Sequence, residues 1–224
     1  MLESMGSKLP KQINVPRSVP NFKEPIQAID LHGFGDASGD GTSAAVYAVV
    51  YQEAGVSQGI VEAKRRIAKK GLTIPRLELV SGQMVAKMTH NKRGALEGLP
   101  VRNCYGWLDS TVTFYWMSGK GNCKKFVSNR VADIQTKSYI QWGHVSTTEN
   151  LADVGSRGCY GNKLPDQWLS GPEWLARPQD WPEQKVLKSS KESECEARPM
   201  KRELYKGAEI KQDAIDKLLE KHEF

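Results

Sequence analysis

Apolar residues along the chain fall into short runs that predict consecutive strands in the first third of the sequence. Three such runs cover residues 26–36, 44–51 and 56–67, and they are separated by the turn-forming sequence SGDGTS and by Gly55. The middle run, AAVYAVVY, combines small, β-branched and aromatic residues, which is typical of a well-buried strand. Because only short turns connect the three runs, they predict an antiparallel meander.

The pattern changes to helical periodicity after residue 72. Thr73 is the expected N-cap, and Pro75 falls in the first turn of the helix, where proline is tolerated. The apolar residues that recur on one helical face are Leu77, Val80, Met84 and Met88. The glycines and the proline within residues 94–100 are expected to end this helix.

Strands and helices alternate through the next part of the chain. Strands are predicted over residues 104–110 and 139–145, and helices over residues 110–117, 124–135 and 149–158. The whole order is therefore β-β-β-α-β-α-α-β-α. A meander followed by alternating elements predicts an α/β fold with a mixed sheet and helices around it.

The two ends of the chain differ in composition from the middle. Residues 1–24 are rich in proline and poor in apolar residues, which indicates a linker or lead-in. Residues 183–224 are highly charged and support at most one amphipathic helix. The folded domain is therefore expected over residues 25–160. No segment has the apolar character of a secretory signal or a membrane span, so we expect neither secretion nor membrane insertion.

Net charge and cysteine usage narrow the class of protein. The chain has 32 Lys and Arg against 26 Asp and Glu, and residues 183–224 contain ten of each, so the whole excess of +6 lies in residues 1–182. A basic folded region indicates an anionic partner such as nucleic acid, although a soluble basic surface has the same charge. The four cysteines are scattered without zinc-finger spacing, which favours reduced thiols in a cytosolic or nuclear protein.

Four acidic residues occupy positions where a carboxylate is costly. Asp36 and Asp109 end two predicted strands, whereas Glu78 and Asp153 lie among apolar residues of predicted helices. Each has an ordinary structural explanation, such as a turn, a helix cap, a dipole interaction or a solvated face. Four carboxylates in one place would repel one another, and divalent ions such as Mg²⁺ or Mn²⁺ would neutralise them. Their positions at two strand ends and on two helices favour such a cluster.

Five sequence strings carry a resemblance to a known family. LHGFGDAS, TIPRLEL, WLDSTVTFYWM, KKFVSNRVADIQ and WGHVSTTENLADVGSRG occur in this order. They resemble the ribonuclease H domain of BEL/Pao-type retrotransposon polyproteins over residues 26–181. The string GPEWL is similar to the segment that follows the nuclease in that family, so residues 161–182 are interpreted as an extension.

The resemblance implies both a fold and an activity. The fold is ribonuclease H-like, with a five-stranded mixed sheet whose first three strands are antiparallel and whose faces are flanked by helices. The activity is endonucleolytic hydrolysis of the RNA strand of an RNA–DNA hybrid during reverse transcription. The implied partners are the hybrid and the reverse transcriptase domain of the same polyprotein. The implied location is a retroelement particle in the cytoplasm or nucleus.

The same resemblance assigns residues. The metal-binding and catalytic carboxylates fall on Asp36, Glu78, Asp109 and Asp153, which would hold two Mg²⁺ ions, or Mn²⁺, at the scissile phosphate. Asp36 is expected to bridge the ions. His144 could assist product release, as in some ribonucleases H, but a hydrogen bond at a strand end is the favoured interpretation. Arg157 could contact either Asp153 or a phosphate.

Residues for substrate binding are also expected. Ser38 and Ser110 are candidates for recognition of the 2′-hydroxyl of RNA. Two basic groups are candidates for phosphate binding, which would weaken with added salt: Lys64, Arg65 and Arg66 in the first, and Lys124, Lys125 and Arg130 in the second. The first group could equally protect an edge strand by its charge.

Two other functions compete with the nuclease. A DDE-type integrase or transposase core could use Asp36, Asp109 and Glu149, but that assignment leaves Glu78 and Asp153 unexplained. The second alternative is a non-catalytic scaffold with the same fold, which would bind hybrid or a polymerase partner without cleaving anything.

Overall fold

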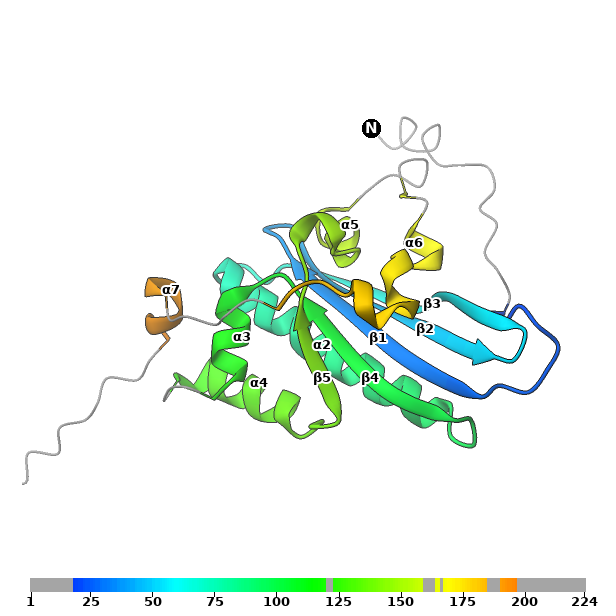
Figure 1. Cartoon of the computed structure of the whole chain (residues 1–224). Helices are drawn as coiled ribbons and strands as arrows, with labels where there is room; N and C mark the ends of the chain where they lie inside the picture. Colours follow the sequence, from blue (N-terminus) through cyan, green and yellow to red (C-terminus); the bar gives the residue numbers. More distant parts are fainter. Residues whose placement is uncertain (1–17, 120–122, 159–163, 166, 185–189, 197–224) are drawn as a thin grey trace, which may run out of the picture.

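A computed structural model of the protein describes residues 18–119, 123–158, 164–165, 167–184 and 190–196 (Figure 1). Their centre is a five-stranded sheet with the strand order β3-β2-β1-β4-β5. The strands are β1 (Ala28–Ala37), β2 (Gly41–Gln52), β3 (Gly55–Ile67), β4 (Val101–Leu108) and β5 (Ile140–His144). Strands β1, β2 and β3 pair antiparallel, whereas β4 pairs parallel with both β1 and β5. This arrangement confirms the predicted mixed sheet.

Helices lie on both faces of this sheet (Figure 1). The helices are α2 (Ile74–Ala95), α3 (Thr111–Met117), α4 (Lys125–Gln135), α5 (Ala152–Arg157), α6 (Gln167–Ser170) and α7 (Lys191–Glu194). Short 3-10 turns are η1 (Thr147–Glu149), η3 (Glu173–Ala176) and η4 (Pro178–Asp180). The single helical segment expected over residues 149–158 is therefore split into η1 and α5, and none of the helices in the described ranges is long and apolar enough to cross a membrane.

Helix α2 lies directly against the central strand β1. Two glycines of β1 make this close approach possible, because a Cβ added at Gly33 would lie 2.5 Å from Cγ1 of Val85. A Cβ at Gly35 would likewise lie 2.9 Å from Cγ2 of Val85. Leu31 of β1 and Leu79 of α2 are fully buried in the core on this face. The N-terminal end of α2 is thereby held next to the end of β1.

The second face of the sheet is covered by the segment that follows α5. Trp174 and Leu175 of this segment pack into one cluster with Phe34, Tyr47 and Trp107 of the sheet. The Trp107 and Trp174 rings meet edge to face with their centroids 4.9 Å apart. The Tyr47 hydroxyl also donates to the main-chain oxygen of Trp168 at 2.9 Å, so the segment joins the sheet through apolar and polar contacts.

Helices α2 and α3 begin where the sequence predicts them, although only one of their two N-cap side chains makes a capping hydrogen bond. Thr73 occupies the N-cap of α2 and Pro75 lies in its first turn, but the Thr73 side chain makes no capping hydrogen bond. Ser110 caps α3, where its hydroxyl accepts from the Thr113 N–H at 3.2 Å. The division of the chain at residues 24, 160 and 182 stays a prediction, and most of the two predicted tails lies outside the described residues.

Candidate active site

Two of the predicted carboxylates stand at the same end of neighbouring parallel strands. Gly35 of β1 pairs with Leu108 of β4, so Asp36 and Asp109 follow next to each other along the edge of the sheet. Asp36 is still within β1 and is only 5% exposed, whereas Asp109 follows β4 directly and is half-buried. Both acids therefore stand at the edge where adjacent strands end.

Helix α5 carries the third carboxylate, Asp153, and is attached to the same strand end. The Asn150 side chain donates to the main-chain oxygen of Gly35 at 2.9 Å, just before Asp36. The Ser38 hydroxyl, in the turn after β1, donates to the main-chain oxygen of Ser156 at 2.8 Å. These two bonds hold both ends of α5 against β1.

The electrostatics of Asp36 show that three of the acids share one environment. Burial raises the pKa of the Asp36 carboxyl to about 6, against the lowering effect of a hydrogen bond from the Ser156 hydroxyl. The negative charges of Asp109 and Asp153 raise the pKa of Asp36 further. A carboxyl group so placed gains from any cation that enters the site.

The fourth carboxylate, Glu78, reaches the site from the first turns of α2. Its Oε2 atom accepts a hydrogen bond from the Ser110 hydroxyl at 2.5 Å. Ser110 follows Asp109 in the chain, so this bond places the Glu78 carboxylate beside the end of β4. The four acids predicted from the sequence thus surround one end of β1 and β4.

Three of the carboxylates accept hydrogen bonds from side chains of the protein. Asp36 accepts from the Ser156 hydroxyl, Glu78 from Ser110, and Asp153 from the Arg157 Nε atom at 2.6 Å. Within the described residues, no three His, Cys, Asp or Glu side chains are arranged to hold a metal ion. The donor set itself consists of carboxylate oxygens, the ligands that Mg²⁺ and Mn²⁺ prefer. Metal binding by these four residues stays a prediction.

His144 and Arg157, the two predicted accessory residues, both lie at the site. The His144 Nε2 atom is 3.2 Å from the main-chain oxygen of Asp109, and its backbone N–H donates to Gln184 Oε1 at 2.7 Å. Arg157 pairs with Asp153, and that hydrogen bond, together with the charges of Asp153, Asp36 and Asp109, raises the pKa of its guanidinium. The Arg157 side chain is 66% exposed, so it can also meet a ligand in solution.

The residues predicted to bind substrate fall into two positions. The Ser38 and Ser110 hydroxyls border the acids but are used in the hydrogen bonds described above. Lys64, Arg65 and Arg66 are exposed on the edge strand β3, and Arg65 Nη2 is 3.5 Å from the main-chain oxygen of Ser156. Arg65 therefore lies beside α5 and the acids.

The second basic group lies on α4 and just before it, on the face of the sheet that α2 covers. Lys124 and Lys125 are exposed, whereas Arg130 is half-buried with its guanidinium 3.6 Å from the centroid of the Phe126 ring. The two basic groups thus come from different elements. Their role in phosphate binding stays a prediction.

Sequence reasoning missed three residues that shape this site. Asn150 and Ser156 hold α5 and Asp36 through the hydrogen bonds given above. Arg76, two residues before Glu78, binds a carboxylate far along the chain. All three belong to the strings TIPRLEL and ENLADVGSRG. Their presence in those strings was the available signal, because composition and periodicity do not distinguish them.

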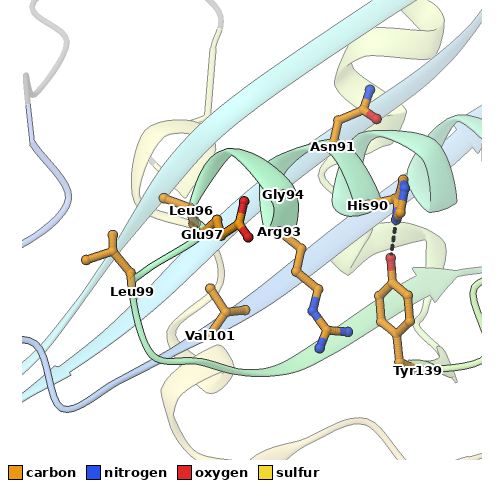
Figure 2. A pocket seen from close by; sticks show the side chains of 9 residues that line it. All are labelled: His90, Asn91, Arg93, Gly94, Leu96, Glu97, Leu99, Val101 and Tyr139. Carbon is orange, nitrogen blue, oxygen red and sulfur yellow. Dashed lines mark hydrogen bonds between the residues drawn. The ribbon is translucent and has the colours of Figure 1, made fainter.

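A separate surface pocket lies at the opposite end of α2 and contains none of the four acids (Figure 2). His90 Nδ1 and the Tyr139 hydroxyl are 2.7 Å apart there, and the Arg93 guanidinium lies 4.3 Å from the centroid of the Tyr139 ring. At a rise of about 1.5 Å per residue, Arg93 is roughly 20 Å along the helix from Glu78. This pocket is therefore distinct from the candidate active site.

Comparison with known proteins finds one family model that matches part of the chain. Residues 2–110 match the family model of the Pao retrotransposon-like RNaseH-like domain, which confirms the resemblance found in the sequence. This matched range includes Asp36, Glu78 and Asp109. No curated protein matches the sequence significantly.

Solved ribonuclease H structures are also similar to the chain. The N-terminal RNase H domain of a Mycobacterium tuberculosis protein, solved as a fusion with maltose-binding protein, has 17% identity and a TM-score of 0.39 over 58% of this chain and 91% of that one. RNase H1 from Halobacterium salinarum has 13% identity and a TM-score of 0.38, and the match covers 63% of this chain and 96% of that one. LC11-RNase H1, solved with an RNA/DNA hybrid, has 16% identity and a TM-score of 0.39 over 61% and 99%.

Proposed function

We propose that this chain, whose residues 2–110 match a Pao retrotransposon-like RNaseH-like domain, is an endonuclease that hydrolyses the RNA strand of RNA–DNA hybrids. The observation that carries the proposal is the position of Asp36. It is a buried carboxyl group beside two like charges, with a pKa raised to about 6. Carboxyl groups whose pKa is shifted by burial and by neighbouring like charges cluster at functional sites.

Two divalent ions, Mg²⁺ or Mn²⁺, would be held by Asp36, Glu78, Asp109 and Asp153. The oxygen-only donor set and the mutual repulsion of the acids both favour hard cations. When bound, such ions supply Lewis acidity at the phosphate and lower the pKa of an attacking water. Asp36 is the proposed bridging residue because β1 is the central strand and its end lies beside Asp109.

The protein's own residues would prepare this chemistry. Ser156 and Ser110 donate hydroxyl hydrogens to Asp36 and Glu78, which keeps both carboxylates oriented while they are ionised. Arg157 balances the charge of Asp153 and is exposed enough to contact a phosphate oxygen. Arg65, beside α5, would attract the backbone of the nucleic acid, and binding would weaken with added salt.

Cleavage of a labelled RNA–DNA hybrid, with Mg²⁺, Mn²⁺ and EDTA in parallel, tests the proposal. We expect cleavage with either metal and none with EDTA. Asp109→Asn should lower the rate ~100-fold or more, because loss of even a supporting group at a metal site costs about 10- to 100-fold. The matched control is Glu53→Gln, which removes one charge from an exposed turn and should leave the rate within about twofold.

The same experiment separates the two alternatives. A scaffold without activity would bind hybrid but release no product with any metal. An integrase-type core would join DNA ends, so the assay includes a DNA strand-transfer substrate. Glu149, which that alternative requires, is exposed and accepts a hydrogen bond from the Ser146 hydroxyl at 2.7 Å. Equal cleavage by Asp109→Asn and the unmodified chain, with both folded, would contradict the nuclease.

A further inference from the structure

Two arginine side chains gather beside the first turn of α2. The Arg76 and Arg130 guanidinium carbons lie 5.0 Å and 3.6 Å from the centroid of the Phe126 ring. Burial and the neighbouring charge of Arg76 lower the pKa of Arg130. The Arg130 Nε atom is buried and has no hydrogen-bond partner within the described residues. Two cations and an unsatisfied donor therefore share one place, which is the composition of an anion-binding site.

A carboxylate from far along the chain already binds one of these two arginines, Arg76. Glu196 accepts two hydrogen bonds from Arg76, at 2.7 Å from Nε and 3.0 Å from Nη2. The Glu196 side chain is only 9% exposed. Such a two-bond contact with a guanidinium is the geometry that carboxylates and phosphates share. The position of the Glu196 carboxylate thus marks where an oxyanion binds.

The segment that carries Glu196 is held mainly by polar contacts. Trp116 Nε1 donates to the Ser193 main-chain oxygen at 3.1 Å, and the Lys124 backbone N–H donates to the Glu196 main-chain oxygen at 2.7 Å. Residues 190–196 read SKESECE and contain no large apolar side chain. The segment therefore gains little from the hydrophobic effect. A phosphate that replaced the Glu196 carboxylate would restore the two hydrogen bonds to the Arg76 guanidinium.

The anion site is connected to the candidate active site through helices α2 and α3. Arg76 precedes Glu78 by two residues on α2, and Glu78 is hydrogen-bonded to Ser110, the N-cap of α3. Helix α3 also contains Trp116, which contacts the Glu196 segment. A nucleic acid strand bound at the four acids would have to extend past α3 to place a backbone phosphate at Arg76.

We propose that Arg76 and Arg130 bind a backbone phosphate of nucleic acid, and that the Glu196 carboxylate occupies this site in the free protein. This inference rests on the proposed function for the position of the strand. It adds that the Glu196 carboxylate competes with a nucleic acid phosphate for Arg76. The C-terminal segment would leave Arg76 when nucleic acid binds. The full chain therefore binds nucleic acid more weakly than its cationic surface alone would allow.

Binding of a fluorescent RNA–DNA hybrid to the full chain, measured by anisotropy in EDTA, tests this proposal. We expect Glu196→Gln to lower the Kd about five- to tenfold, because Arg76 is released. The matched control, Glu194→Gln, removes the same charge from an exposed position of the same segment and should change the Kd by less than about twofold. Arg76→Gln should weaken binding, and adding Glu196→Gln to it should have no further effect.

Several outcomes would contradict the proposed competition between Glu196 and a backbone phosphate. If Glu196→Gln and Glu194→Gln changed the Kd equally, the effect would come from net charge and not from release of Arg76. If Glu196→Gln weakened hybrid binding, the contact between Glu196 and Arg76 would have a structural role instead. Tighter binding of inorganic phosphate with unchanged hybrid binding would indicate a small-anion site instead. Glu196→Asp, which keeps the charge but shortens the side chain, serves as a second variant if Glu196→Gln does not fold. Because EDTA excludes cleavage, these results do not depend on whether the chain is an active nuclease.

Discussion

The position of Asp36 lowers the stability of the folded protein when its carboxyl group is ionised. In the unfolded chain its carboxyl group ionises near 3.8, whereas in the folded protein it keeps its proton to about pH 6. The folded state therefore binds more protons between these values, and the free energy of unfolding falls as the pH rises from about 4 to 6. Burial is the main cause, and the charges of Asp109 and Asp153 add to it.

Replacement of Asp36 by asparagine should remove this cost. We predict that Asp36→Asn raises the free energy of unfolding by ~1–3 kcal/mol above pH 6.5 and changes it little below pH 4, because asparagine does not ionise and can still accept from Ser156. Urea unfolding at both pH values measures the effect. Asp40→Asn, at an exposed turn, is the control for loss of one charge. A gain of equal size at both pH values would contradict this explanation.

At the scale of elements, α5 depends on the sheet for its existence. It has six residues, too few to be stable alone in water. Asn150 and Ser156 attach it to the end of β1, and Gly155 lets its backbone approach Ser43 of β2. A Cβ at Gly155 would lie 2.9 Å from the Ser43 Cβ and closer still to its hydroxyl oxygen. The position of Asp153 therefore depends on this contact.

Gly155→Ala should push α5 away from β2. We predict a loss of ~1–3 kcal/mol in the free energy of unfolding, as for other overpacked sites, together with slower hybrid cleavage. The matched control is Gly94→Ala in α2, where an added Cβ would meet no atom within 4 Å. That change should be neutral or stabilising by up to ~1 kcal/mol. Thermal and urea unfolding of both variants measures the difference. Equal stability of Gly155→Ala and Gly94→Ala would contradict the prediction.

Across the whole molecule, the segment after α5 completes the second face of the sheet. Leu175 is fully buried, and its side chain packs with Phe34, Tyr47 and Trp107. The five-stranded sheet and the following segment therefore share one core in the described residues. Their stabilities should be coupled, because a cavity made in the segment is also a cavity beside the sheet.

Leu175→Ala tests this coupling. We predict a loss of ~2–5 kcal/mol in the free energy of unfolding, in a single transition, because the change leaves a cavity against the sheet. Leu99→Ala is the control, since Leu99 is 44% exposed and its loss should cost less than ~0.5 kcal/mol. Two separate unfolding transitions, or equal effects of both variants, would show that the segment folds independently of the sheet.

Much of the fold was predictable because strands and helices leave recognisable patterns of apolar residues in the local sequence. The meander over β1, β2 and β3 follows from apolar runs with short turns, and α2 follows from its 3.6-residue periodicity after Thr73. The grouping of the acids could also be predicted, since parallel neighbours end at one edge and Asp36 and Asp109 end two of them. The predicted ends differ from the structure by a few residues, because local signals weaken where an element stops.

The tertiary structure alone decided what each of these side chains meets. The bond from Ser156 to Asp36, the pairing of Arg76 with Glu196 and the burial of Trp174 against Trp107 all join positions more than 60 residues apart. Periodicity places a residue on a face of its own element, but it carries no information on which distant element covers that face. By itself, the sequence determined the elements, their order and the chemistry available. The partners and the pKa of Asp36 depend on burial and on charges brought together only by folding.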